Sequence, residues 1–190
     1  MKKLSPRSEY MLLVALFVVY LVLLTWTILW KLAVPWVGAS AGLFHPIKLV
    51  PYVADANANA SAPLEVVANI LLFVPFGVYL GLLAPSWRWW LKAMVFVVAS
   101  LALETAQHLL STGSFDVTDV IDNTAGGLVG LAVFALARRR LAARTRPVLG
   151  RVLLVASVVA LLAVVIFVAS PLRYAQQPDV VLPGVGVNAP

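Results

Sequence analysis

Long apolar stretches constrain the fold of this chain more than any other feature of its sequence. A helix needs roughly 20 mostly apolar residues to cross the hydrocarbon core of a bilayer. Five stretches reach that length: Tyr10–Trp30, Leu64–Ala84, Trp87–Leu110, Asp119–Ala137 and Leu149–Ser170. With 62% of its 190 residues hydrophobic, the chain is far more apolar than a soluble domain of its size. The sequence therefore predicts an all-α fold, a polytopic bundle of five transmembrane helices in the cell membrane.

A single transmembrane domain is expected to occupy residues 1–170. Residues 171–190 contain several Pro and Gly residues and no long apolar run, so they are expected to form a flexible external tail. The basic N-terminal end resembles a secretory signal, but its apolar run exceeds the roughly 7–15 residues of a signal core. We expect this segment to be retained as the first helix.

Basic residues indicate the orientation of the bundle, because short cytoplasmic loops are rich in Lys and Arg. One side would carry Lys2, Lys3, Arg7, Arg88, Lys92, Arg138, Arg139, Arg140, Arg144, Arg146 and Arg151. The other side would carry only Lys31, Lys48 and Arg173. We therefore predict a cytoplasmic N-terminus and an external C-terminus. The net charge of +6 then reflects topology and contact with anionic membrane lipids, and no nucleic acid partner is expected.

The segment Lys31–Pro63 is the longest region outside the predicted helices. It contains four prolines and is expected to be irregular, external and able to cover the outer end of the bundle. We expect its basic groups, His45 and Lys48, to be solvated.

Gly126 and Gly130 form a pair of small residues spaced four apart in the fourth stretch, and Gly127 lies beside them. Such a pair allows another helix to approach closely. The spacing itself does not say which helix that is.

Polar residues with chemical potential gather at one end of the predicted bundle. They are Asn69 in the second stretch, Glu104, Gln107 and His108 in the third, and Asp116, Asp119, Asp122 and Asn123 at the start of the fourth. Spacings of three and four residues place the members within a helix on one face. Because consecutive helices run in opposite directions, we predict one polar cluster that faces the extracytoplasmic side.

Glu104 is the strongest candidate for a functional role. An ionisable residue inside a span costs roughly 2.5–3.5 kcal/mol on insertion scales, so it normally faces the bundle and is paired. We assign hypothetical catalytic roles to Glu104 and Asp119, and substrate binding to the other six polar residues. Structural roles stay open: Asp119 as a helix cap, Asp116 as a solvated turn residue, and the amides as interhelical hydrogen-bond partners.

A divalent cation is the candidate cofactor. Hard cations prefer oxygen ligands, and Glu104, Asp119 and Asp122 could supply them. The chain has no cysteine, which excludes a thiolate metal site. The helices bring acidic groups but no Lys or Arg to the cluster, so a phosphate substrate would need such a cation to offset repulsion.

Several motifs together resemble the VanZ-like family of bacterial membrane proteins. They are Asn69–Gly77 (NILLFVPFG), Glu104-x-x-Gln107, and Asp116–Gly127 (DVTDVIDNTAGG). The stretch Ile47–Tyr52 resembles the hydrophobic, proline and aromatic motif that precedes the second helix in that family. The resemblance covers about residues 45–136. The turn Ser111–Phe115 lacks the arginine that many members carry there.

The family's namesake is associated with resistance to the glycopeptide antibiotic teicoplanin, which implies a role in the bacterial cell envelope. One hypothesis is a non-catalytic binding or accessory protein that influences glycopeptide susceptibility through the polar cluster. Another is an enzyme acting on a lipid-linked or headgroup substrate at the outer leaflet, with Glu104 as acid or base. The candidate partners are then an envelope lipid-linked precursor or the antibiotic.

A third hypothesis is a proton or solute transporter in which Glu104 and His108 are relay groups. The polar residues stop at the outer end of the predicted bundle, so no polar path leads to the cytoplasm. The acidity of the cluster agrees best with the binding hypothesis.

Overall fold

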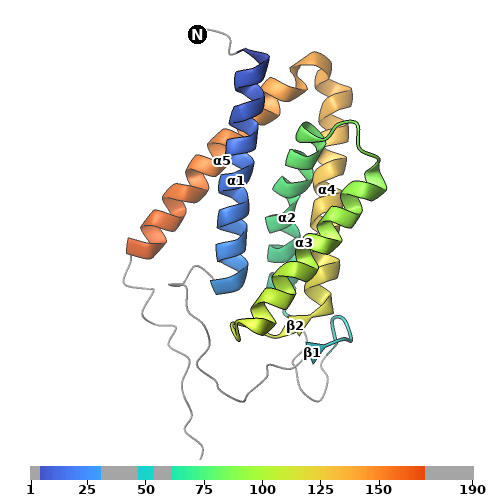
Figure 1. The fold of residues 1–190 in the computed structure, drawn as a ribbon, viewed down its shortest axis with the longest axis vertical. Helices are drawn as coiled ribbons and strands as arrows, with labels where there is room; N and C mark the ends of the chain where they lie inside the picture. The colour runs from blue at the N-terminus through green and yellow to red at the C-terminus, as the bar shows by residue number, and fades with distance from the viewer. Residues whose placement is uncertain (1–4, 31–46, 54–60, 170–190) are drawn as a thin grey trace, which may run out of the picture.

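The computed structural model describes residues 5–30, 47–53 and 61–169. Five α helices lie in these ranges: α1 (Pro6–Trp30), α2 (Pro63–Leu83), α3 (Trp89–Leu109), α4 (Val117–Leu141) and α5 (Thr145–Ala169). The helices run alternately down and up the long axis of the molecule (Figure 1). Each predicted apolar stretch overlaps one helix. The terminal tail, His45 and the basic residues Lys2, Lys3, Lys31 and Arg173 lie outside the described residues.

Within the described residues, four helical segments are long and apolar enough to cross a membrane: Arg7–Trp30, Pro63–Leu83, Trp89–Leu109 and Val117–Ala169. The last of these includes both α4 and α5, which are joined by the short 3₁₀ turn η1 (Ala142–Arg144). The chain reverses direction at η1, so α5 runs back alongside α1 (Figure 1). The predicted helical membrane bundle is confirmed to this extent, and the five crossings and their orientation stay predictions.

Helices α2 and α4 approach each other closely because glycines line their contact. A Cβ atom at Gly126 or at Gly130 would collide with backbone carbonyl oxygens of α2. Gly127 faces α3 instead, where a Cβ atom would lie 2.5 Å from ring atoms of Phe96. The small residues of α4 therefore let two neighbours pack closely: the backbone of α2 and an aromatic ring of α3.

Apolar side chains fill the rest of the bundle in two clusters. One joins α1, α2 and α5 through Leu13, Val78 and Leu153. The other joins α1, α2 and α3 around Phe73 and Phe96, both completely buried. Much of α5 faces outward with apolar side chains, as expected of a surface that contacts lipid.

Two short strands depart from the all-α prediction. Strand β1 (Ile47–Lys48) pairs in parallel with β2 (Phe115–Asp116), and Lys48 is the register partner of Asp116. Because β2 immediately precedes α4, the pairing holds residues 47–53 against the start of that helix (Figure 1). We call residues 47–53 the strap, the end of the bundle beneath it the strap end, and the opposite end the η1 end.

Candidate functional site: a buried polar cluster at the strap end

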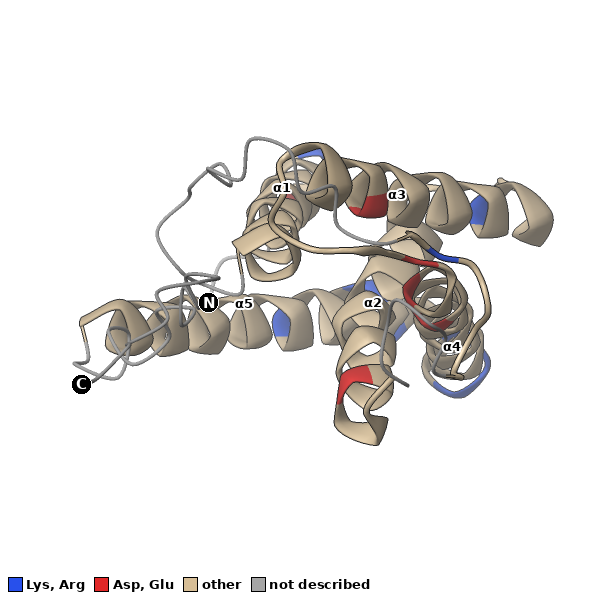
Figure 2. Cartoon of the chain, turned by 90° about the horizontal axis from the view of Figure 1, so that it is seen from below, with Lys and Arg blue, Asp and Glu red and all other residues tan. Residues whose placement is uncertain are grey.

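Polar side chains from α2, α3, α4 and the strap meet at the strap end. Figure 2 views this end, where α3 and the start of α4 each carry acidic residues of the cluster. The core of the group is buried, with exposed fractions of 1% for Glu104 and 2% for Asp122. We call the following residues the polar cluster: Lys48, Tyr52, Ser61, Asn69, Ser100, Glu104, Asp116, Thr118, Asp119, Asp122 and Asn123.

Asp116 caps α4. Its backbone is extended, and its Oδ1 accepts a hydrogen bond of 2.7 Å from the backbone N–H of Thr118. This bond satisfies one of the N–H groups that have no partner within a helix at its first turn. The sequence suggested Asp119 for the capping role, but α4 begins earlier than predicted and Asp119 lies inside its first turn. Asp116 is therefore a structural participant rather than a solvated turn residue.

Lys48 is the main correction to the sequence-based interpretation. We expected it to be solvated, but it is only 2% exposed. Its Nζ donates to Asp116 Oδ2 at 3.0 Å and to Ser61 Oγ at 2.7 Å. The helices themselves bring no Lys or Arg to the cluster, but a buried cation comes from a loop that strand pairing holds in place.

Tyr52 holds the other end of the strap. Its hydroxyl donates to Asp122 Oδ1 at 2.9 Å, and its backbone N–H donates to Thr118 Oγ1 at 3.1 Å. Its φ of 63° lies in the left-handed region that an aromatic residue seldom adopts, so these contacts hold a strained backbone. Partial burial and the hydrogen bond to Asp122 raise the pKa of Tyr52 above its ordinary value of 10.0.

Amide side chains link α4 to its neighbours. Asn69 Nδ2 donates to Asp119 Oδ1 at 2.8 Å, and Asn123 Nδ2 donates to Ser100 Oγ at 2.8 Å. The structure thus joins α2 to α4 through two predicted residues, Asn69 and Asp119, and joins α4 to α3 through the predicted Asn123 and Ser100. Sequence reasoning missed Ser100, although it lies one turn before Glu104 on the same face of α3, and that spacing could have indicated it.

Glu104 lies beneath the point where the strap meets α4. Its Oε2 accepts a hydrogen bond of 3.0 Å from the backbone N–H of Asp116. Its Oε1 is buried and accepts no hydrogen bond from any described residue. Asp122 Oδ2 and Asn123 Oδ1 are also buried and accept no hydrogen bond from the described part of the chain. A buried acceptor without a partner costs about 1–3 kcal/mol, so these atoms are the chemically unsatisfied part of the cluster.

Gln107 and His108 are arranged differently from the other predicted site residues. Gln107 Nε2 donates to the backbone carbonyl of Ile28 in α1 at 3.1 Å. An α-helix turns about 100° per residue, so a step of three residues rotates Gln107 by about 60° from Glu104, which is enough to direct it to a different neighbour. The amide therefore ties α3 to α1. His108 lies half-buried in the last turn of α3.

The proposed metal ligands are not gathered into one set. Among the described residues, no group of three or more His, Cys, Asp or Glu side chains could hold a metal ion. Glu104 accepts from the backbone of Asp116, Asp119 from Asn69, and Asp122 from Tyr52. Each carboxyl group thus has a different protein donor, and the arrangement does not match the three-carboxylate site that the sequence suggested.

Five members of the cluster lay outside the predicted site: Lys48, Tyr52, Ser61, Ser100 and Thr118. The first two belong to the motif Ile47–Tyr52 that carries part of the family resemblance. That motif was the available signal for them. No comparable signal marks Ser61, which accepts from Lys48 and lies 3.3 Å from Thr118 Oγ1.

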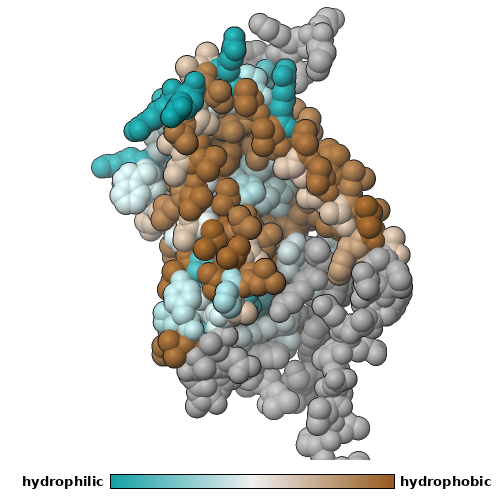
Figure 3. Space-filling model, turned by 180° about the vertical axis from the view of Figure 1, so that it is seen from behind, coloured by the Kyte–Doolittle hydropathy of each residue, from teal (hydrophilic) through white to brown (hydrophobic). Residues whose placement is uncertain are grey.

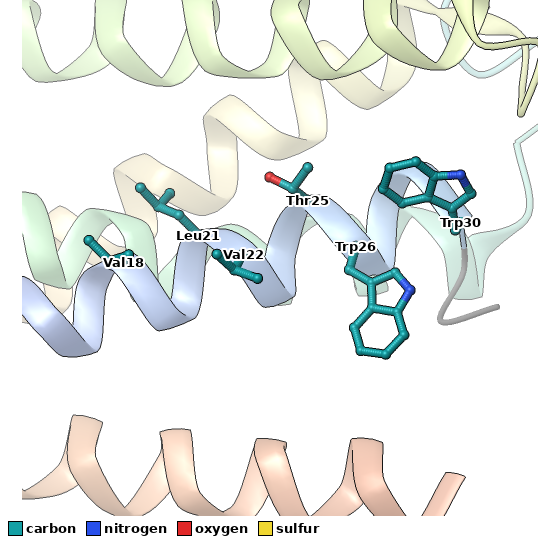
Figure 4. Close-up of a pocket in the computed structure, with 6 residues that line it drawn as sticks. All are labelled: Val18, Leu21, Val22, Thr25, Trp26 and Trp30. Carbon is teal, nitrogen blue, oxygen red and sulfur yellow. The ribbon is translucent and has the colours of Figure 1, made fainter. Parts of the chain in front are cut away.

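A concave feature separate from the polar cluster lies on α1, and it is apolar. A pocket of about 600 Å³ is lined by Val18, Leu21, Val22, Thr25, Trp26 and Trp30 (Figure 4). No residue of the polar cluster lines it. Its apolar lining suits a hydrocarbon chain, whereas hydrogen-bonding chemistry belongs to the polar cluster.

Comparison of the amino-acid sequence with known proteins identifies relatives of this chain. Residues 17–138 match the sequence model of the family described as VanZ/LLP1. Protein VanZ of Enterococcus faecium is 31% identical over 126 residues, which cover 66% of this chain and 75% of that protein. No solved structure matches the chain. The family match begins at residue 17, so it includes much of α1 as well as the region of motif resemblance.

Proposed function

Because this chain belongs to the VanZ/LLP1 family, we propose that it acts in the bacterial cell envelope as a non-catalytic binding or accessory protein. The polar cluster is its binding site, and its effect is on susceptibility to glycopeptide antibiotics. Family membership supports the role in the cell envelope, and the buried acceptor atoms beneath the strap support the binding role.

The membrane arrangement in this proposal has five crossings, with a cytoplasmic N-terminus and the polar cluster on the extracytoplasmic side. Its support is the separation of charges along the bundle. Six arginines lie between Arg138 and Arg151, at the η1 end, whereas the acidic cluster lies at the strap end. Arginine-rich short loops stay in the cytoplasm, which leaves the strap end outside.

The ligand in this proposal is a donor of hydrogen bonds, such as an amine or a hydroxyl-bearing headgroup. The observation that carries it is the set of buried acceptors without a described donor: Glu104 Oε1, Asp122 Oδ2 and Asn123 Oδ1. Donors on a ligand would remove the cost of leaving these atoms unsatisfied. An envelope lipid-linked precursor and a glycopeptide antibiotic both carry such groups.

A second candidate is an envelope enzyme that acts on a lipid-linked or headgroup substrate, with Glu104 as acid or base. One carboxyl oxygen of Glu104 is held by the backbone of Asp116 while the other has no described partner, which is a suitable arrangement for proton transfer. Lys48 also supplies a cation close to the acidic groups. The carboxylates would therefore repel a phosphate less strongly than the acidic residues of the helices alone would.

Substitution of Glu104 separates the two candidates. Glu104→Gln keeps the shape and an acceptor oxygen but removes the exchangeable proton, whereas Glu104→Leu removes both acceptors. The binding proposal expects cells producing Glu104→Gln to keep part of the effect, because one amide oxygen replaces two carboxyl oxygens while Asp122 and Asn123 still accept, and Glu104→Leu to abolish it. Glu65→Gln is the matched control, because Glu65 is an exposed carboxylate at the same end of the bundle.

Susceptibility must be compared at equal membrane abundance and equal thermal stability of the variants. A folded Glu104→Gln protein without any effect would favour acid–base catalysis over binding. Full effect in Glu104→Leu would show that the polar cluster has no part in the function.

Labelling of single cysteines tests the proposed orientation, and the natural chain has none to interfere. Ala62→Cys lies at the strap end and Ala143→Cys in η1, and both alanines are exposed. A membrane-impermeant maleimide applied to intact cells should label Ala62→Cys only. Labelling of Ala143→Cys instead would invert the orientation and remove the extracytoplasmic site.

A further inference from the structure

The η1 end carries the most strongly charged surface of the described chain. We call the following arginines the basic turn: Arg138, Arg139, Arg140, Arg144, Arg146 and Arg151. No acidic residue lies between Asn123 and Ala169. The one ion pair within residues 5–30, 47–53 and 61–169 is Lys48–Asp116 at the opposite end. Within these described ranges, no arginine of the basic turn forms an ion pair with an acidic residue.

A pocket opens within this charged surface. It has a volume of about 400 Å³ and is lined by Phe134, Ala135, Arg138 and Arg139, all from the last turns of α4. Phe134 is held from behind by α2, because a Cβ atom at Gly81 would collide with its ring. One wall is thus a fixed aromatic ring, and guanidinium groups form the other.

The pocket lies where apolar surface passes into charged surface. Val133 and Leu136 of α4 are 42% and 56% exposed, and Val148 and Val152 of α5 are exposed as well. Figure 3 shows the hydrophilic end of the molecule directly bordering a hydrophobic face. For a helix that crosses a bilayer, this boundary is the depth of the phospholipid phosphate groups.

We propose that the pocket binds an anionic phospholipid of the surrounding bilayer. Arg138 and Arg139 bind the phosphate, because guanidinium groups form paired hydrogen bonds with its oxygens. Phe134 and Ala135 contact the first methylene groups of the acyl chains. The other arginines of the basic turn attract anionic lipid from a distance without forming the site.

The purified full-length protein tests the site through its retention of lipid. Protein in a mild non-ionic detergent would be mixed with phosphatidylglycerol or phosphatidylcholine, and bound lipid counted by native mass spectrometry. We expect selective retention of phosphatidylglycerol, weakened about tenfold or more in the double variant R138Q/R139Q. The matched control R144Q/R151Q removes the same charge from exposed arginines that do not line the pocket, and it should retain lipid much as wild type does.

Equal weakening in both double variants would mean diffuse attraction without a site and would overturn the proposal. Absence of any preference for phosphatidylglycerol in the wild-type protein would do the same. Inorganic phosphate at the same concentration should not displace the lipid, and efficient displacement would show that the acyl contact with Phe134 contributes nothing. Thermal unfolding of each variant without lipid confirms that the folded state is intact.

Discussion

The two ends of the helix bundle handle charge in opposite ways. At the strap end, carboxyl groups are buried or half-buried and receive hydrogen bonds from Lys48, Asn69, Tyr52 and backbone N–H groups. At the η1 end, the basic turn consists mainly of exposed arginines without a described acidic partner. Helices α2 and α4 are in backbone contact between these ends.

This difference shows that the strap end, unlike the η1 end, depends on hydrogen-bond partners that the protein itself supplies. Burial of a charged or polar group costs free energy unless the protein supplies partners, so the strap end must be arranged by many mutual contacts. Exposed charges at an interface are solvated by water and headgroups, and they need no such arrangement. Substitutions should therefore destabilise the strap end far more than the η1 end.

The largest effect is expected where the contact of α2 with α4 is broken. Gly130→Ala places a Cβ atom against the backbone of Val74 and Gly77. Because backbone groups cannot rotate away, we expect a loss of more than roughly 3 kcal/mol, above the usual cost of overpacking. Thermal unfolding in detergent measures it.

Gly150→Ala in α5 is the control, since its Cβ would meet only Leu13 Cδ2 at 3.7 Å, an ordinary contact. It should be neutral or slightly stabilising, because alanine favours a helix by about 1 kcal/mol over glycine. Equal stability of the two variants would contradict the close packing of α2 on α4.

A smaller effect is expected from loss of the buried cation. Lys48→Met leaves Asp116 without its partner, and breaking a fully buried pair costs roughly 3–5 kcal/mol. Because the Asp116 side chain is 16% exposed, we expect about 2–3 kcal/mol here. The double variant Lys48→Met with Asp116→Asn should recover part of the loss. Arg144→Met in the basic turn should change stability by less than about 0.5 kcal/mol. A comparable loss of stability in Lys48→Met and Arg144→Met would contradict the greater dependence of the strap end on internal partners.

The smallest effect concerns Tyr52 and depends on pH. Tyr52→Phe removes the hydrogen bond to Asp122 and should cost about 1 kcal/mol near neutral pH. The folded-state pKa of Tyr52 is raised, so its contribution is complete below the unfolded value of about 10 and is lost as the pH rises through the folded value.

The measurement is the difference in free energy of unfolding between wild type and Tyr52→Phe, followed from about pH 8 to pH 11. It should be constant at first and then shrink. Tyr10→Phe at the η1 end is the control, because Tyr10 contributes a ring beneath Arg146 and Phe keeps that ring. A pH-independent difference for Tyr52 would mean that its hydroxyl does not act through Asp122.

Much of the bundle could be predicted from the amino-acid sequence. Helix positions follow from apolar length, which is a local property, and the helices begin and end within about four residues of the predicted stretches. The gathering of Asn69, Glu104, Asp119 and Asn123 at one end follows from the alternating direction of consecutive helices. The spacing of Gly126 and Gly130 predicted a close helix contact but did not identify α2 as the partner.

The strap and its contacts could not be read in the same way. Lys48 and Asp116 are 68 residues apart, and Tyr52 and Asp122 are 70 apart, in a segment with no periodic pattern to indicate what it faces. The turn of Gln107 toward α1 likewise depends on where a neighbouring helix lies. Apolar length and helix direction are properties of consecutive residues, so the amino-acid order alone was sufficient for the bundle and its polar end. Which donor meets which buried carboxyl group depends on distant segments packing together, because only that packing excludes water and makes one partner preferable to another.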